Sequence, residues 1–168
     1  MKRLYLIRHA KSSWAEPGLP DFDRPLNGRG KADAPFMGRR LADHGVSPDL
    51  ILSSPAKRAR KTARRIAETV GFPKDLIRFD ETIYEADVPD LLAAIARVPD
   101  EHDVLFFVGH NYGITDLAQW LTGRNTGVMP TCGVVGIEFD RLSWQGLQEG
   151  SGRLLFFDFP KKHHGRSE

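Results

Sequence analysis

The sequence has a single cysteine, no long hydrophobic run and almost no net charge. Cys132 alone cannot form an internal disulfide or a cysteine-based zinc cage. No apolar stretch approaches the ~20 residues of a membrane span. The opening residues MKRLYLIRHA also lack the long apolar region and the small-residue cleavage site of a signal peptide. We therefore expect a cytoplasmic protein with no membrane partner.

The charge balance gives little support to a nucleic-acid-binding function. Lys and Arg number 24 against 22 Asp and Glu, a net charge of +2 at neutral pH. The basic residues gather in PAKRARKTARR, residues 55–65, without an interleaved aromatic side chain for base stacking. Helical spacing puts Ala59, Ala63 and Ile66 on one face, so most of these cations face solvent and Arg58 is the exception. We expect no nucleic-acid partner.

Strand and helix patterns alternate along the chain. Short apolar runs bounded by turn residues predict strands at 3–8, 49–53, 76–79, 104–108, 134–139 and 154–159. Helical patterns lie at 28–44, 55–70, 88–98 and 111 to about 121, with expected N-caps at Asn27, Ser54, Asp87 and Asn111.

This order predicts a single-domain α/β fold over residues 1–160. We expect a largely parallel central sheet of about six strands with helices on both faces, ending in an antiparallel hairpin. Residues 161–168, KKHHGRSE, are expected to form a polar, frayed C-terminal tail whose two histidines are solvated rather than ligands.

Three segments bring histidine or arginine to the ends of predicted strands. The first strand ends in Arg8 and His9, the fourth leads into His110, and the second leads into a helix whose first turn holds Arg58. In an open α/β sheet, ligands bind at the carboxyl ends of the strands. A single histidine there is usually an ordinary polar strand end, but two make a shared site more plausible. We expect these four side chains to meet.

The position of Arg58 predicts an anion beside it. A cation in the first turn of a helix opposes the macrodipole at a cost of ~0.3–1 kcal/mol unless an anion offsets it. Two guanidinium groups, two imidazoles and helix N-termini suit a tetrahedral phosphoryl group. Arginines beside the histidines would repel a metal ion. The pattern therefore predicts phosphoryl chemistry without a metal or other cofactor, in which an imidazole is the nucleophile.

Four segments, in order, resemble the histidine phosphatase superfamily, the phosphoglycerate mutase-like clan. LYLIRHAKSSW resembles its Arg-His-Gly signature with Ala10 in place of the glycine, and PLNGRGKADA its Leu-x-x-x-Gly helix start. ILSSPAKRARKTA resembles its Ser-x-x-x-Arg-Ala-x-x-Thr segment, and VLFFVGHNYG its second histidine. The short length, RHAKSSW and VGHN are most similar to SixA-type phosphohistidine phosphatases, which remove phosphate from histidine in proteins.

The resemblance implies a role for each of the gathered residues. His9 would be the nucleophile, and Arg8 and Arg58 would bind phosphate. His110 would contact the phosphoryl oxygens and stabilise the transition state, and Asn111 is a further predicted phosphate-binding residue. The roles of Lys11 and the serines that follow it are left open.

The segment before the second histidine is shorter than the one that supplies a lid and an acidic proton donor in the mutases. Only a short segment, ETIYEADVPDLLAAIARVPDEHD (residues 81–103), lies between the third and fourth predicted strands. We therefore expect an open site, which suits a protein-borne phosphate. Glu85 is the candidate acid and Glu81 the alternate, although a solvated loop carboxylate explains either equally well. The same ambiguity, between bordering the site and ordinary loop polarity, holds for Asp21, Asp23 and Arg24.

Together these patterns predict a metal-independent phosphatase that forms a phosphohistidine intermediate, with a phosphohistidine protein as substrate. One alternative is a phosphomonoesterase of the same fold that acts on a small phosphorylated metabolite. Others are a non-catalytic phosphoprotein-binding module and, less favoured still, a basic nucleic-acid-binding domain.

Overall fold

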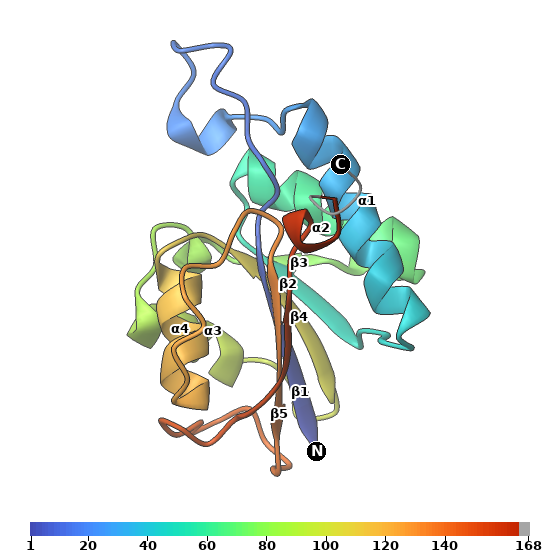
Figure 1. The fold of residues 1–168 in the computed structure, drawn as a ribbon. Helices are drawn as coiled ribbons and strands as arrows, with labels where there is room; N and C mark the ends of the chain where they lie inside the picture. Colours follow the sequence, from blue (N-terminus) through green and yellow to red (C-terminus); the bar gives the residue numbers. More distant parts are fainter. Residues whose placement is uncertain (165–168) are drawn as a thin grey trace.

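In the computed structural model, which describes residues 1–164, six strands form one sheet with helices on both faces (Figure 1). The spatial order of the strands is β3-β2-β4-β1-β5-β6. The first four strands are parallel, β5 is antiparallel to β1, and β6 is antiparallel to β5. The predicted fold class is confirmed. The strands are β1 (Lys2–Arg8), β2 (Leu50–Ser53), β3 (Arg78–Phe79), β4 (Val104–Gly109), β5 (Val134–Phe139) and β6 (Arg153–Asp158).

Each face of the sheet is covered by a pair of helices (Figure 1). Because side chains alternate along a strand, Leu4 and Leu6 of β1 join the core under one pair, and Tyr5 and Ile7 join the core under the other. Burial on both sides explains the nearly continuous apolar run of this strand. The helices are α1 (Gly28–Asp43) and α2 (Lys57–Val70) on one face, and α3 (Val88–Ala96) and α4 (Gly113–Thr122) on the other.

Two of the four predicted N-caps are confirmed. The Asn27 side chain accepts a hydrogen bond from the Gly30 N–H at 2.9 Å at the start of α1. Asp87 begins α3 with a capping box, in which its side chain and that of Asp90 each accept a backbone N–H of the other residue. These caps satisfy backbone donors that a helix leaves unpaired in its first turn.

Ser54 and Asn111 are not the helix caps that the sequence predicts. Ala56 occupies the N-cap position of α2 and Tyr112 that of α4, and neither makes a side-chain cap bond. The Ser54 and Asn111 side chains instead bond to groups at the carboxyl edge of the sheet. Local propensity for capping is overridden here by tertiary contacts.

The third predicted strand is shorter than expected. Only Arg78–Phe79 pairs with β2, because residues Lys74–Leu76 form a 3-10 turn, η2. Within this turn the Leu76 N–H bonds to the Pro73 carbonyl and the Ile77 N–H to the Lys74 carbonyl. These donors are therefore not available to a longer β ladder. Two further 3-10 turns lie near the sheet edge, η1 (Asp21–Asp23) and η3 (Glu81–Ile83).

The first part of the C-terminal tail is ordered rather than frayed. Lys161–His164 forms a short helix, α5, in which His163 Nε2 lies 2.6 Å from Asp158 Oδ1. The rest of the predicted tail, 165–168, lies outside the described residues. None of the helices in residues 1–164 has the length and apolar character to cross a bilayer.

Candidate active site

The carboxyl ends of β1 and β4 bring the two histidines together beside Arg58. Arg8 pairs in register with Gly109, and the His9 N–H donates to the Gly109 carbonyl at 3.0 Å. The ring centroids of His9 and His110 lie 5.1 Å apart. The Nε–H of Arg58 donates to His9 Nε2 at 3.4 Å. Three of the four side chains that were expected to meet, those of His9, Arg58 and His110, thus form one cluster at the carboxyl ends of parallel strands.

His9 is a neutral imidazole with a lone pair on Nε2. Its Nδ1 lies 2.8 Å from the Ala10 carbonyl oxygen, which can only accept, so Nδ1 carries the hydrogen. Burial and the positive charges nearby lower the pKa of His9 to about 3, although the hydrogen bond to the Ala10 carbonyl opposes this shift. The side chain is only 7% exposed. An unprotonated, fixed Nε2 is what a nucleophilic histidine needs.

Thr62 fixes the turn that follows His9. Its buried hydroxyl accepts the Ala10 N–H at 2.9 Å and donates to the Arg58 carbonyl at 2.8 Å. The same side chain therefore ties the turn after β1 to the helix that carries Arg58. The threonine of the Ser-x-x-x-Arg-Ala-x-x-Thr segment is a positioning residue that the sequence interpretation left without a role.

The anion beside Arg58 is the carboxylate of Asp21. The buried guanidinium donates to the Asp21 carbonyl at 2.7 Å and to Asp21 Oδ2 at 3.0 Å. This carboxylate also accepts bonds from the Tyr84 hydroxyl at 2.6 Å and from Arg24 at 3.0 Å. Burial favours the neutral acid, but these donors outweigh it and hold the pKa of Asp21 at about 2. Asp21 is therefore ionised, and it holds two nitrogens of Arg58 while the third faces His9.

His110 lies in a second set of polar contacts. Its Nε2 is 2.7 Å from the Ser54 hydroxyl, which also accepts the Ala56 N–H at 3.2 Å. The Tyr84 ring packs edge-on against it at 5.5 Å. Burial lowers the pKa of His110 to about 4, and the charge of Arg58 adds to this shift. Like His9, His110 is neutral at physiological pH.

Two buried nitrogens in this cluster lack a hydrogen-bond partner among residues 1–164, His110 Nδ1 and Arg8 Nε. A buried polar atom without a partner costs about 1–3 kcal/mol. If the Ser54 hydroxyl donates its hydrogen to Nε2 of His110, Nδ1 carries the ring hydrogen and is a donor. Both nitrogens are then hydrogen-bond donors without a partner among the described residues.

Asn111 takes part in holding Arg8. The Met129 carbonyl accepts from Nη1 of Arg8 and from the Asn111 amide, both at 2.9 Å. The Thr115 hydroxyl donates to the Asn111 amide oxygen at 2.6 Å. These bonds use the oxygen and one hydrogen of the Asn111 amide within the loop. The predicted contact of Asn111 with phosphate stays a prediction.

Neither candidate acid touches the histidines. Glu85 and Glu81 are both exposed, and within the described part of the chain neither side chain has a hydrogen bond or an ion pair. Glu85 adopts a φ of 54°, in the left-handed region, directly after Tyr84. The role of either glutamate as an acid stays a prediction.

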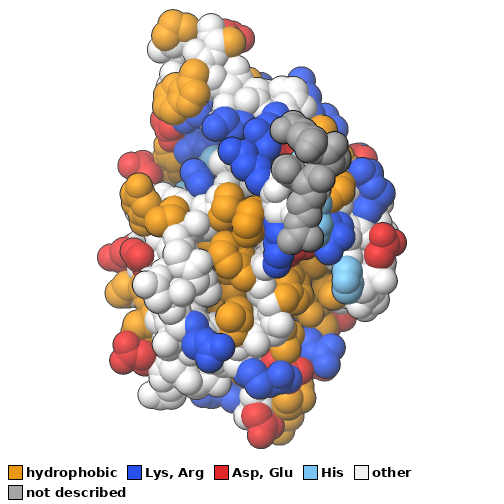
Figure 2. All heavy atoms as spheres, viewed as in Figure 1, with side chains coloured by type: hydrophobic (Ala, Val, Ile, Leu, Met, Phe, Trp, Pro, Cys, Tyr) orange, Lys and Arg blue, Asp and Glu red, His pale blue; other side chains and the backbone are white. Residues whose placement is uncertain are grey.

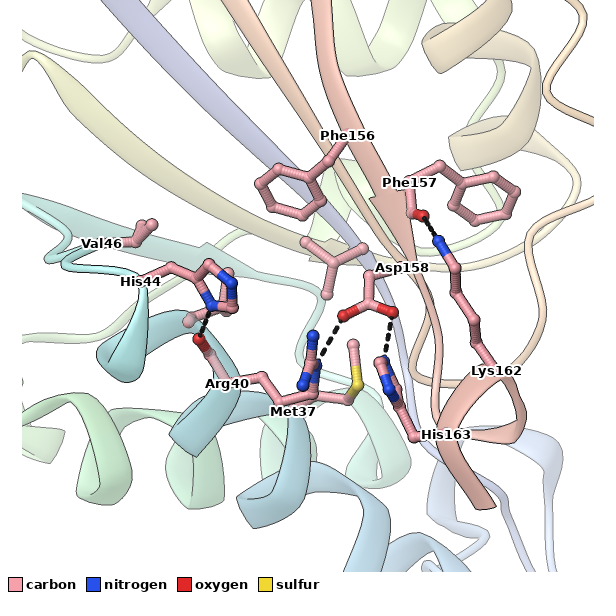
Figure 3. Close-up of a pocket in the computed structure, with 11 residues that line it drawn as sticks. Met37, Arg40, His44, Val46, Phe156, Phe157, Asp158, Lys162 and His163 are labelled. Atoms are coloured by element: carbon pink, nitrogen blue, oxygen red, sulfur yellow. Dashed lines mark hydrogen bonds and ion pairs between the residues drawn. The ribbon is translucent and has the colours of Figure 1, made fainter. Parts of the chain in front are cut away.

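An apolar cavity of about 410 Å³ lies away from this cluster (Figure 3). It is open to solvent and is lined mainly by α1, β6 and α5, with Met37 and Phe156 among its apolar residues. The charged groups around it pair with one another, since Asp158 accepts from Arg40 at 2.8 Å and lies 2.6 Å from His163. None of the predicted site residues lines it. Residues 1–164 also hold no group of three or more His, Cys, Asp or Glu side chains that could bind a metal ion.

Buried neutral histidines make the folded protein sensitive to acid. In the unfolded chain His9 and His110 have a pKa near 6.5, against about 3 and about 4 when folded. Below pH 6.5 the unfolded state therefore binds protons that the folded state does not. We expect the free energy of unfolding to fall by up to about 1.4 kcal/mol per pH unit for each histidine between pH 6.5 and pH 4. Urea denaturation across this range measures the slope. The slope should be smaller in the double variant His9→Gln and His110→Gln, and an unchanged slope there would contradict the assignment.

The family model described as histidine phosphatase superfamily (branch 1) matches residues 4–102 of this chain. An uncharacterized chloroplastic protein of Arabidopsis thaliana is 34% identical over 153 residues, which are 86% of this chain and 69% of that protein. The model match alone spans more than half of the sequence.

Solved structures share the fold over nearly the whole chain. A candidate phosphohistidine phosphatase SixA from Agrobacterium tumefaciens superposes with a TM-score of 0.79 at 32% identity, covering 95% of this chain and 98% of that one. The protein histidine phosphatase SixA complexed with tungstate superposes with a TM-score of 0.81 at 18% identity, with coverage of 95% and 98%, and shows the common fold. The family-model match over more than half of the sequence shows that this chain belongs to the histidine phosphatase superfamily.

Proposed function

We propose that this protein is a metal-independent phosphatase that works through a phosphohistidine intermediate on His9, and that its substrate is phosphohistidine in a protein. The observation that carries the proposal is the unprotonated Nε2 of His9, which lies 3.4 Å from the buried guanidinium of Arg58. Membership of the superfamily and the SixA structures support phosphatase activity. The identification of the substrate as a phosphohistidine protein is the more specific part of the proposal.

In the structure the His9 Nε2 lone pair accepts the Arg58 Nε–H at 3.4 Å. The reaction begins when this hydrogen bond is released and the lone pair attacks phosphorus in line. A new N–P bond forms as the bond to the leaving group breaks, and charge on the equatorial oxygens is held by Arg8, Arg58 and His110. The hydrogen on Nδ1 stays bonded to the Ala10 carbonyl, which stabilises the positive ring of phospho-His9. Water then attacks phosphorus, the N–P bond breaks, and phosphate leaves with the neutral imidazole restored.

An exposed rim favours a protein over a small metabolite as substrate. Trp14 and Tyr112, in the loops that follow the two histidines, are 74% and 69% exposed. The segment between β3 and β4 contains only the short η3 and α3. A small ligand is usually bound by enclosing most of its surface, whereas an open site can receive a side chain that projects from a protein.

A turnover assay tests the proposal. The protein is given a phosphohistidine protein, p-nitrophenyl phosphate, sugar phosphates and nucleotides, and released phosphate is measured. We expect kcat/KM to be highest for the phosphohistidine protein. A higher kcat/KM for one small phosphate would favour the phosphomonoesterase alternative. Binding of the phosphoprotein without release of phosphate would favour the non-catalytic module.

The need for an acid should depend on the leaving group. The P–N bond of phosphohistidine is labile, whereas an alkoxide is a poor leaving group unless it is protonated. Glu85→Gln should therefore leave phosphohistidine hydrolysis within about twofold, and slow alkyl phosphate hydrolysis by about 100-fold if Glu85 is the acid. Glu81→Gln is assayed in parallel, and it should show the slower alkyl phosphate hydrolysis instead if Glu81 is the acid. Glu85→Gln could instead lose phosphohistidine hydrolysis and retain activity on an activated aryl phosphate. That result would contradict both the assignment of the substrate and the assignment of Glu85 as the acid.

A further inference from the structure

A positively charged pocket of about 240 Å³ lies next to Arg8 at the carboxyl edge of the sheet. Besides Arg8, its basic lining comes from Lys11 in the loop after β1, Arg29 in the first turn of α1, and Lys161 at the start of α5. Figure 2 shows Lys and Arg side chains gathered over this end of the molecule. The chain thus brings cations from three separate segments to one pocket.

The pocket has little negative charge of its own. Among the described residues that line it, Asp33 is the one acid, and its carboxylate is 7% exposed and lies 3.5 Å from Arg29. Lys11 and Lys161 are exposed and have no ion pair within residues 1–164. Cations gathered in this way repel one another, and an anion bound among them relieves the repulsion.

The position of the pocket relative to the histidines is fixed by the backbone. The Lys11 carbonyl accepts the Asn27 N–H at 3.0 Å, and a Cβ added at Gly30 would lie 2.2 Å from the same oxygen. The start of α1 is therefore packed tightly against the turn after His9. Arg8 connects the pocket with the histidine cluster. It lines the pocket, and its charge helps to lower the pKa of His9 and of His110.

We propose that Lys11, Arg29 and Lys161 form a second anion subsite, which binds an acidic group that the substrate carries beside its phosphoryl group. This inference rests on the proposed function, since Arg8 is shared with the phosphoryl site. The carboxylates that flank a phosphohistidine on a protein surface have this chemistry, and so does a second phosphate on a small metabolite. The three cations select the substrate and take no part in the chemical step.

Two phosphohistidine peptides of equal length, one with glutamates and one with glutamines around the histidine, test the subsite. We expect the wild-type protein to hydrolyse the glutamate peptide with about tenfold higher kcat/KM, because three exposed charge contacts each contribute about twofold. The triple variant Lys11→Gln, Arg29→Gln and Lys161→Gln should lose this preference. Its activity on p-nitrophenyl phosphate should stay within about twofold, which also shows that it folds.

Arg39→Gln is the matched control variant. Arg39 is an exposed arginine of the same helix, ten residues or about 15 Å further along α1 than Arg29. The Arg39→Gln variant removes one positive charge, as Arg29→Gln does, and should keep the preference for the glutamate peptide. If the triple variant does not fold, Lys11→Gln and Lys161→Gln should each lower the preference about twofold.

A second arm uses inhibitors of p-nitrophenyl phosphate hydrolysis. Stronger inhibition by methylenediphosphonate than by methylphosphonate, lost in the triple variant, supports a subsite that takes a second phosphate. The proposed subsite is wrong if the wild-type protein prefers neither the glutamate peptide nor methylenediphosphonate. It is also wrong if either preference persists in the triple variant. A wild-type protein that hydrolyses p-nitrophenyl phosphate but neither peptide refutes the protein substrate, and the inhibitor comparison still decides the subsite.

Discussion

Replacing His9 with alanine should lower kcat for every substrate by at least about a thousandfold. The variant lacks the atom that accepts the phosphoryl group in the proposed mechanism, and the Arg58 guanidinium, which lies 3.4 Å from that atom, is not a nucleophile. Rapid quenching of the wild-type protein with substrate should trap a phosphoenzyme that is labile in acid and stable in base. Peptide mapping should place the phosphate on His9.

His44→Ala is the control for this experiment. His44 is an exposed histidine that follows α1, and its Nδ1 bonds to the Arg40 carbonyl. Its loss should leave turnover and labelling unchanged. A His9→Ala protein that retains turnover, or a label on another residue, would rule out the proposed mechanism.

Replacing Arg58 with alanine should lower kcat by about 100- to 1,000-fold, the usual effect of removing one preorganised donor to transition-state charge. Arg58 is a buried cation that contacts His9 Nε2, and in the proposed mechanism its charge offsets that of the phosphoryl oxygens as they become more negative. Arg58→Lys should recover little of the loss, since an ammonium cannot reproduce the fork that spans His9 and Asp21.

The same variant has a signature that a general loss of structure would not give. Arg58 contributes to the lowered pKa of Asp21, His9 and His110, so its removal should raise all three. NMR titration of the folded Arg58→Ala protein measures these values. Lys61→Ala, one turn further along α2, removes a charge but should change neither kcat nor these values. An unchanged kcat in Arg58→Ala would show that this guanidinium does not act on the reacting group.

The basic run of α2 shows how far a sequence pattern can be taken. The helical spacing of its alanines correctly predicts that Arg58 lies apart from the other cations, and Arg58 is buried beside His9. An anion does lie next to Arg58, but it is the Asp21 carboxylate of the same chain, and the phosphate site inferred from the position of Arg58 stays a prediction. Asp21 is 37 residues away in the sequence, and ordinary loop polarity explained it equally well.

The helix caps show where local rules fail. Asn27 caps α1 as predicted because its partner, Gly30, lies three residues away and the bond needs nothing beyond the first turn. Ser54 and Asn111 have the same capping propensity, but their side chains bond to His110 and to Met129. His110 is 56 residues from Ser54, and Met129 is 18 residues from Asn111, so no local sequence pattern predicts these bonds.

The sequence by itself determined the α/β fold and the meeting of His9, Arg58 and His110. Apolar runs define the strands, and the carboxyl ends of parallel strands share one edge of a sheet, so residues placed there must converge. Only the tertiary structure decided the protonation of His9, the Asp21 contact that orients Arg58, and the gathering of Lys11, Arg29 and Lys161 in one pocket. These depend on burial and on contacts between loops, which spacing along the chain does not encode.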